Sequence, residues 1–202
     1  MLSRVASRVS LHSRQRKLRL FHELLRPGPE TTVLDVGATD AAFGDGSTDN
    51  FFEALYPWPQ RITAVGITPL ETFAASFPEV SVVQADGREL PFPDGAFDIG
   101  FSNAVVEHVR GGREEQRRFV HELCRCSRRA FLTTPNRFFP LEVHTLVPFA
   151  HWLPRELRDR VLHARGFHDV LEPLGPGELA SLFPYPVRIV NTGMTLIAVG
   201  PQ

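Results

Sequence analysis

The chain has 202 residues, of which 43% are hydrophobic and 22% are charged, and its formal net charge is −1. This length and composition are typical of one globular domain with a sizeable core, and they exclude a largely disordered chain. No stretch approaches the roughly 20 uninterrupted apolar residues of a membrane-spanning helix, and the net charge gives no overall attraction to nucleic acid. We therefore expect a cytoplasmic protein without a nucleic-acid partner.

The N-terminal segment is basic, because residues 1–30 carry a net charge of +5 and the remaining residues carry −6. Leucines and Phe21 recur at helical spacing, which predicts a packed helix from about residue 15 that ends at Arg26-Pro27. Two alternatives stay open: an Arg- and Ser-rich organelle transit peptide, and a basic patch in weak peripheral contact with a membrane. Lys17 is the only lysine among the 22 basic residues, which we interpret as a compositional bias of the genome.

Short apolar runs alternate with helical segments after Pro29. We expect strands at 31–37, 62–67, 80–86, 97–103 and 130–134, and helices at 51–56, 70–77 and 114–126. Such alternation favours an α/β fold in which helices cover both faces of a mostly parallel, doubly wound sheet.

The end of the chain follows another pattern. Two further strands, at 187–190 and 196–199, are joined by a loop that is too short for a crossover helix, so they must pair antiparallel. The residues from 135 to 186 hold eight of the 17 prolines, and we predict that they form a lid over a substrate site. The predicted organisation is a basic helical extension at 1–29 and a single domain at 30–202.

Three polar motifs follow predicted strands. They are Asp35-Val36-Gly37, Asp86-Gly87, and Asn103 within Ser102-Asn103-Ala104. An open parallel sheet binds ligands outside the carboxyl ends of its strands, and glycine lets the backbone approach a ligand closely. The three motifs therefore predict one ligand site at this edge of the sheet.

In this order, the motifs resemble those of the class I S-adenosylmethionine-dependent methyltransferases, especially the small-molecule, type 11-like branch. The resemblance implies a Rossmann-like sheet of seven strands with an antiparallel last strand, S-adenosylmethionine as the cofactor, and a small-molecule substrate. It also implies that Asp35 and Gly37 line the methionine end of the cofactor, that Asp86 and Gly87 face the adenine, and that Asn103 lies under the sulfonium.

The sequence departs from the family pattern at two places. Gly37 is followed by Ala38-Thr39-Asp40 rather than by further glycines. The second strand of the family ends in an acid that binds the ribose, and the matching position here is Gly66. We expect Asp40 or Glu71 to take over this role.

Two histidines are candidates for a catalytic base. His144 lies two residues after Glu142 in the proline-rich stretch, and an imidazole can take a proton from a hydroxyl or amine nucleophile near neutral pH. His108 follows Asn103 and is the rival candidate, and for both residues a structural role is the alternative. A Glu–His pair offers too few ligands for a metal, so no metal site is predicted.

The sequence thus predicts a methyltransferase that acts on a small molecule. A non-catalytic domain that keeps the fold as a binding module is the alternative, because the first loop and Gly66 depart from the pattern. A nicotinamide-dependent oxidoreductase would need the full Gly-x-Gly-x-x-Gly turn and an acid after the second strand, and both are missing.

Overall fold

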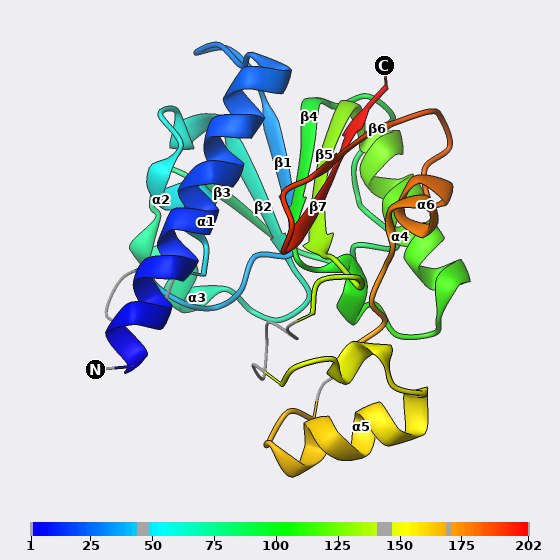
Figure 1. The fold of residues 1–202 in the computed structure, drawn as a ribbon. Coiled ribbons are helices and arrows are strands. Elements are labelled where there is room, and N and C mark those ends of the chain that lie inside the picture. The colour runs from blue at the N-terminus through cyan, green and yellow to red at the C-terminus, as the bar shows by residue number, and fades with distance from the viewer. Residues whose placement is uncertain (1, 44–48, 141–146, 169–170, 202) are drawn as a thin grey trace.

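A single mixed sheet organises the fold (Figure 1). The computed structural model describes residues 2–43, 49–140, 147–168 and 171–201. Within these ranges seven strands have the order β3-β2-β1-β4-β5-β7-β6. They are β1 (Val33–Val36), β2 (Ile62–Gly66), β3 (Ser81–Gln84), β4 (Phe97–Asn103), β5 (Ser127–Pro135), β6 (Arg188–Asn191) and β7 (Thr195–Gly200). Strands β1 to β5 pair parallel and β7 is antiparallel to both of its neighbours, which confirms the predicted fold class.

Helices cover both faces of this sheet. One face carries α1 (Leu2–Leu25), α2 (Phe51–Leu55) and α3 (Glu71–Ser76), and the other carries α4 (Arg113–Cys126) and α6 (Pro176–Ser181). Short 3-10 turns lie at Pro59–Arg61 (η1), Val106–His108 (η2) and Ala150–Trp152 (η3). Val33 of β1 packs with the helices of the first face, and Leu34 packs with those of the second. Successive side chains point to opposite faces of the sheet, and both faces are covered by helices. The strands are therefore short continuous apolar runs in the sequence.

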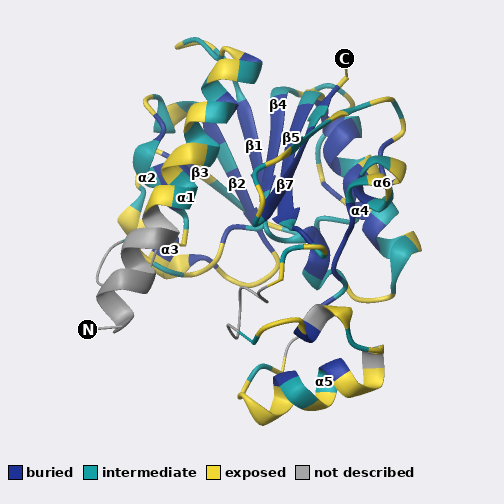
Figure 2. Ribbon diagram, viewed as in Figure 1, coloured by how far each residue is buried: buried dark blue, intermediate teal, exposed yellow. Residues whose placement is uncertain are grey.

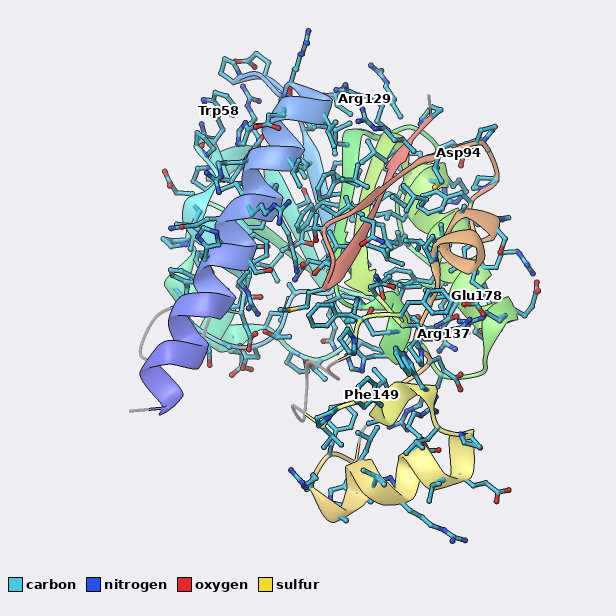
Figure 3. All side chains as sticks on the ribbon, viewed as in Figure 1. Trp58, Asp94, Arg129, Arg137, Phe149 and Glu178 are labelled. Carbon is cyan, nitrogen blue, oxygen red and sulfur yellow. The ribbon has the colours of Figure 1, made fainter. Side chains whose placement is uncertain are left out.

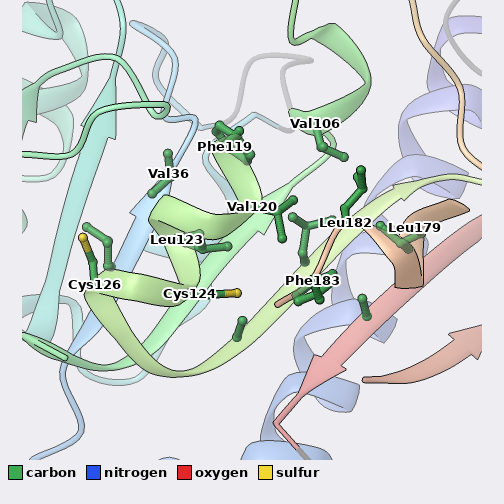
Figure 4. Packing of buried hydrophobic residues seen from close by; sticks show 14 of the residues in the cluster. Val36, Val106, Phe119, Val120, Leu123, Cys124, Cys126, Leu179, Leu182 and Phe183 are labelled. Atoms are coloured by element: carbon green, nitrogen blue, oxygen red, sulfur yellow. The ribbon is translucent and has the colours of Figure 1, made fainter. Parts of the chain in front are cut away.

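Helix α4 shows how the sequence pattern specifies packing. Phe119, Val120, Leu123 and Cys124 recur at helical spacing, and all four are buried against the sheet, as predicted (Figure 4). The hydroxyl of Tyr185 donates a hydrogen bond to Cys124 Sγ over 3.1 Å, and Cys124 and Cys126 are both free thiols. Burial raises the pKa of the Cys124 thiol to about 11, so this thiol is inert near neutral pH.

Helix α1 is anchored in the core by its C-terminal half. Phe21 is fully buried, and its ring lies 5.1–6.0 Å from the rings of four core aromatic residues: Phe52, Tyr56, Phe101 and Phe131. Leu25 is buried with it, and Arg26 leaves the helix in the left-handed region at φ 47°. The prediction of a packed helix is therefore confirmed. The helix begins at Leu2, well before the expected residue 15.

The stretch from 135 to 186 has two structurally different parts. In its last part, Leu174, Leu179 of α6 and Leu182 are fully buried in the core. Helix α5 (Arg155–Ala164) lies apart from the sheet and buries Leu162 in a small cluster with Ala150 and Leu171 (Figures 1 and 2). The 2.8 Å ion pair between Arg137 and Glu178 lies where the two parts meet (Figure 3).

Candidate functional site

A cavity of about 850 Å³ opens at the carboxyl ends of β1 and β4. These neighbouring strands mark the point where the strand order reverses, which is where open α/β sheets bind ligands. The cavity wall includes all six residues predicted to bind the cofactor: Asp35, Gly37, Asp40, Asp86, Gly87 and Asn103. It also includes His108. The structure therefore brings together the three motifs that the sequence singled out.

The first loop owes its shape to Gly37. This residue has a φ of +118°, and a Cβ atom on it would lie 2.1 Å from Cγ2 of Val105. Only glycine lets the loop following β1 turn here while Val105 packs against it. The loop is fixed further by Asn50, whose side chain donates to the carbonyl oxygens of Thr39 and Ala41 over 2.9 and 2.7 Å.

Two buried carboxyl groups face the cavity at the end of β1. Asp35 and Glu53, which α2 supplies, are 6% and 3% exposed and both line the wall. Burial raises the pKa of Asp35 well above its usual range, and so do the charge of Glu53 and a hydrogen bond that forms between the two carboxyls when one is protonated. Neither Glu53 oxygen has a hydrogen-bond donor among the residues that the structure describes. Such a pair needs either a proton or a cationic donor.

The residues expected near the ribose are arranged differently from the prediction. Gly66 does not line the cavity, whereas Ile67 and Thr68 do, and Ile67 is 68% exposed. A Cβ atom on Gly66 would lie 2.7 Å from the carbonyl oxygen of Ala38, so an acid at this position would displace the first loop. Of the two predicted substitutes, only Asp40 lines the cavity, and its Oδ1 accepts a 3.0 Å bond from the Phe73 amide in α3.

Asp86 and Gly87 lie on the wall that follows β3. The carboxylate of Asp86 binds Arg88 through both oxygens, with the shortest contact, 2.6 Å, between Arg88 Nη2 and Oδ2. The hydrogen bonds and charge of Arg88 hold the pKa of Asp86 below its usual value, so Asp86 is ionised near neutral pH. Gly87 is packed closely, since a Cβ atom there would lie 2.5 Å from the ring of Phe119.

Asn103 ends β4 and has an unexpected partner. Its Oδ1 accepts hydrogen bonds from Lys17 Nζ on α1 and from Thr133 Oγ1 on β5, each over 2.8 Å. A second α1 residue, Arg14, lines the cavity with its guanidinium 5.8 Å from the ring centre of Phe51. Helix α1 therefore contributes directly to the site, which the sequence did not predict.

Of the two candidate bases, only His108 belongs to the residues that the structure describes. His108 lines the cavity and its ring lies 6.4 Å from that of Phe167. His144 and Glu142 lie outside the described residues. Within the predicted lid, the aromatic residues Phe138, Phe149 and Trp152 are more than half exposed and do not line the cavity.

Within the described ranges, no three His, Cys, Asp or Glu side chains are grouped closely enough to hold a metal ion. No helix in the same ranges is long and apolar enough to cross a membrane.

Comparisons with known proteins point to one family. A family model described as a methyltransferase domain matches residues 34–130. Two Mycobacterium tuberculosis proteins, from strains CDC 1551 and H37Rv, are named probable S-adenosylmethionine-dependent methyltransferases and are 32% identical over 117 residues. The aligned stretch covers 55% of this chain and 39% of each relative, so the match spans well under half of their length.

Solved structures share the fold. A Burkholderia thailandensis 1,6-didemethyltoxoflavin-N1-methyltransferase, with bound 1,6-didemethyltoxoflavin and S-adenosylhomocysteine, has a TM-score of 0.57 and 16% identity over 91% of this chain and 75% of its own. An S-adenosylmethionine-dependent methyltransferase from Mesorhizobium loti has a TM-score of 0.58 and 13% identity over 84% of this chain and 90% of its own. At such identities, the likeness shows the fold alone.

Proposed function

We propose that this chain, which belongs to the class I S-adenosylmethionine-dependent methyltransferases, transfers a methyl group from S-adenosylmethionine to a small organic acceptor. The observation that carries the proposal is the buried carboxyl pair of Asp35 and Glu53, which faces a cavity at the point where the strand order reverses. A small acceptor agrees with the size of this cavity, about 850 Å³, which is within the usual range for small-molecule sites. We also retain the cytoplasm as the proposed location.

The described residues fit this cofactor by charge. S-adenosylmethionine has a cationic ammonium group at its amino-acid end, and the unpartnered oxygens of Glu53 are able to accept hydrogen bonds from such a group. Asp35 offers a second carboxyl at the same place. On the wall after β3, Asp86 is ionised and lines the cavity, so it is able to accept a hydrogen bond from the adenine amine.

The cofactor supplies a methyl group that its sulfonium already activates. The protein then has to align the acceptor and exclude water, rather than provide a nucleophile of its own. Val105 closes one wall by packing on Gly37, and Asn103 offers a polar group at the end of β4. Where the acceptor must lose a proton, we assign its removal to His144 or His108, and a comparison of the two alanine variants in a pH–rate profile distinguishes them.

Calorimetry with the reaction product tests the proposed function. We expect S-adenosylhomocysteine to bind the full chain at one site per molecule and NADH not to bind, because the turn and the acid that NADH requires are missing. If S-adenosylhomocysteine fails to bind at millimolar concentration, or if NADH competes with it, the proposed function is wrong.

The Asp86→Ala variant tests the adenine end of the site. We expect the variant to bind S-adenosylhomocysteine more weakly by about 1–3 kcal/mol, because one charged hydrogen-bond acceptor is lost. It should lose similar affinity for 5′-methylthioadenosine, which keeps the adenosine but lacks the amino-acid end. Since the substitution also releases Arg88, Arg88→Met serves as the control and should retain most of the affinity. If Asp86→Ala and the unmodified protein bind S-adenosylhomocysteine with equal affinity, Asp86 does not contact the cofactor.

A further inference from the structure

Helix α1 brings the only lysine of the chain to the end of β4. Lys17 lies one helical turn before the fully buried Phe21, and residues four apart share a helix face. The anchored Phe21 therefore holds Lys17 toward the sheet, where Nζ lies 2.8 Å from Asn103 Oδ1. The pKa of Lys17 is lowered to about 8, mainly by burial and also by the charge of Arg14, whereas the charge of Glu107 acts in the opposite direction. Lys17 is half-buried, and removing an ammonium group from water is costly unless it has partners such as Asn103.

The contact with Lys17 fixes the orientation of the Asn103 amide. An ammonium group has only donors, so the atom that faces it must be the amide oxygen. Thr133 Oγ1 donates a second hydrogen bond to the same amide oxygen, at a distance of 2.8 Å. The amide nitrogen is left with two hydrogens, for which the described residues offer no acceptor, and Asn103 lines the cavity. The side chain thus presents a pair of donors to whatever occupies the cavity beside β4.

Charges are distributed unevenly around the cavity. The ends of β1 and α2 supply the acids Asp35 and Glu53, whereas α1 supplies Lys17 beside Asn103. The second cation of α1, Arg14, is paired with Asp49 over 3.4 Å. The acidic side suits a cationic cofactor. The side of Asn103 combines amide donors with nearby positive charge, which suits an oxygen that carries negative charge.

We propose that Lys17 is a positioning residue that holds the Asn103 amide with its N–H groups toward the cavity, where they bind the methyl acceptor through an anionic oxygen such as a carboxylate or phenolate. The proposal rests on the proposed function and adds to it the chemical class of the acceptor. Lys17 itself acts through Asn103 and does not line the cavity.

Acetate and its neutral counterpart acetamide are suitable probes, because they have nearly the same shape. The side-chain amide signals of Asn103 are followed by NMR in the full chain at constant ionic strength, with and without saturating S-adenosylhomocysteine. We expect acetate to shift these signals and acetamide to leave them almost unchanged.

Three variants complete the test. Lys17→Met lets the amide turn, so acetate should bind about tenfold more weakly, while the affinity for S-adenosylhomocysteine stays the same. Asn103→Asp keeps an acceptor for Lys17 and removes the donors, so it should abolish acetate binding, which is measured by calorimetry in this variant because the amide signals are gone. Arg19→Met removes one positive charge from an exposed position of the same helix and should bind acetate normally.

The proposal is overturned if acetate does not shift the Asn103 signals of the unmodified protein, or if Lys17→Met binds acetate normally. It is also overturned if Arg19→Met loses as much affinity as Lys17→Met, since general charge would then explain the effect. If Lys17→Met does not fold, Asn103→Asp decides whether the Asn103 donors bind acetate, and normal acetate binding by this variant overturns the proposal. The proposed function is tested by a separate measurement, the binding of S-adenosylhomocysteine. Because the acetate titration is also made without S-adenosylhomocysteine, the two proposals can fail independently.

Discussion

Replacing Glu53 with glutamine should stabilise the free protein above the acidic range and, at the same time, weaken cofactor binding. In the unmodified protein, the pKa of Asp35 is raised by burial and by Glu53. Folded Asp35 therefore keeps its proton at pH values where the unfolded chain has lost it, and stability falls as the pH rises from about 4 through the raised pKa. The glutamine side chain carries no charge and is able to donate to Asp35, so this loss of stability should become smaller in Glu53→Gln. Urea unfolding of both proteins between pH 4 and 8 measures it.

The same Glu53→Gln substitution should weaken cofactor binding, although it stabilises the free protein. Without the Glu53 carboxylate, S-adenosylhomocysteine should bind roughly 10–100-fold more weakly, because a charged partner of its ammonium is lost. The affinity for 5′-methylthioadenosine should stay the same, since that molecule has no ammonium. Glu79→Gln, which removes an acid from an exposed position, is the matched control. If Glu53→Gln weakens both ligands equally, the carboxyl pair does not bind the ammonium.

Replacing Phe21 with alanine should destabilise the protein by about 3–5 kcal/mol, as expected for removal of a fully buried phenylalanine ring. Its ring contacts Phe52 and Tyr56 near α2 and Phe101 and Phe131 in the sheet, so the cavity left behind has walls from several elements. Thermal and urea unfolding measure the loss. Glu23→Ala, at an exposed position of the same helix, should change stability by less than about 0.5 kcal/mol.

The Phe21 variant also tests whether α1 is part of the domain. A loss below about 1 kcal/mol would mean that the helix detaches easily from the core and that residues 1–29 form a separable extension. A large loss would mean that the cation-bearing helix and the sheet fold as one unit.

The fold was predictable because its strands have clear sequence patterns. The strand predicted at 97–103 matches β4 at both ends, and the inward residues of α4 were correct. Asp35, Asp86 and Asn103 were found because each lies at the end of an apolar run, and the ends of parallel strands converge in space.

The missed residues depend on packing that a local pattern does not encode. Glu53 lies on a short helix among apolar neighbours, and its burial is decided by how α2 meets β1. The isolated acid within Phe51–Leu55 was the available signal. Lys17 reaches Asn103 from 86 positions away, and the available signal was that it is the only lysine, which we had interpreted as compositional bias. Lysine and arginine differ in a buried setting, because the lysine pKa shifts readily.

Gly66, which the sequence analysis matched to the ribose-binding position of the family, does not line the cavity. Gly66 still belongs to β2, where it pairs with Gln84, whereas Val65 before it and Ile67 and Thr68 after it line the cavity. Sequence patterns place the ends of elements less well than their centres, and a shift of one residue turns a side chain to the other face of the sheet.

A crystal structure of the full chain with S-adenosylhomocysteine tests the central claim most directly. The amino group of the ligand should lie within hydrogen-bonding distance of a carboxyl oxygen of Asp35 or Glu53, and its adenine should lie beside Asp86 and Gly87. A ligand bound with its amino group away from both carboxyls, or bound outside the cavity at the ends of β1 and β4, would contradict the proposed site.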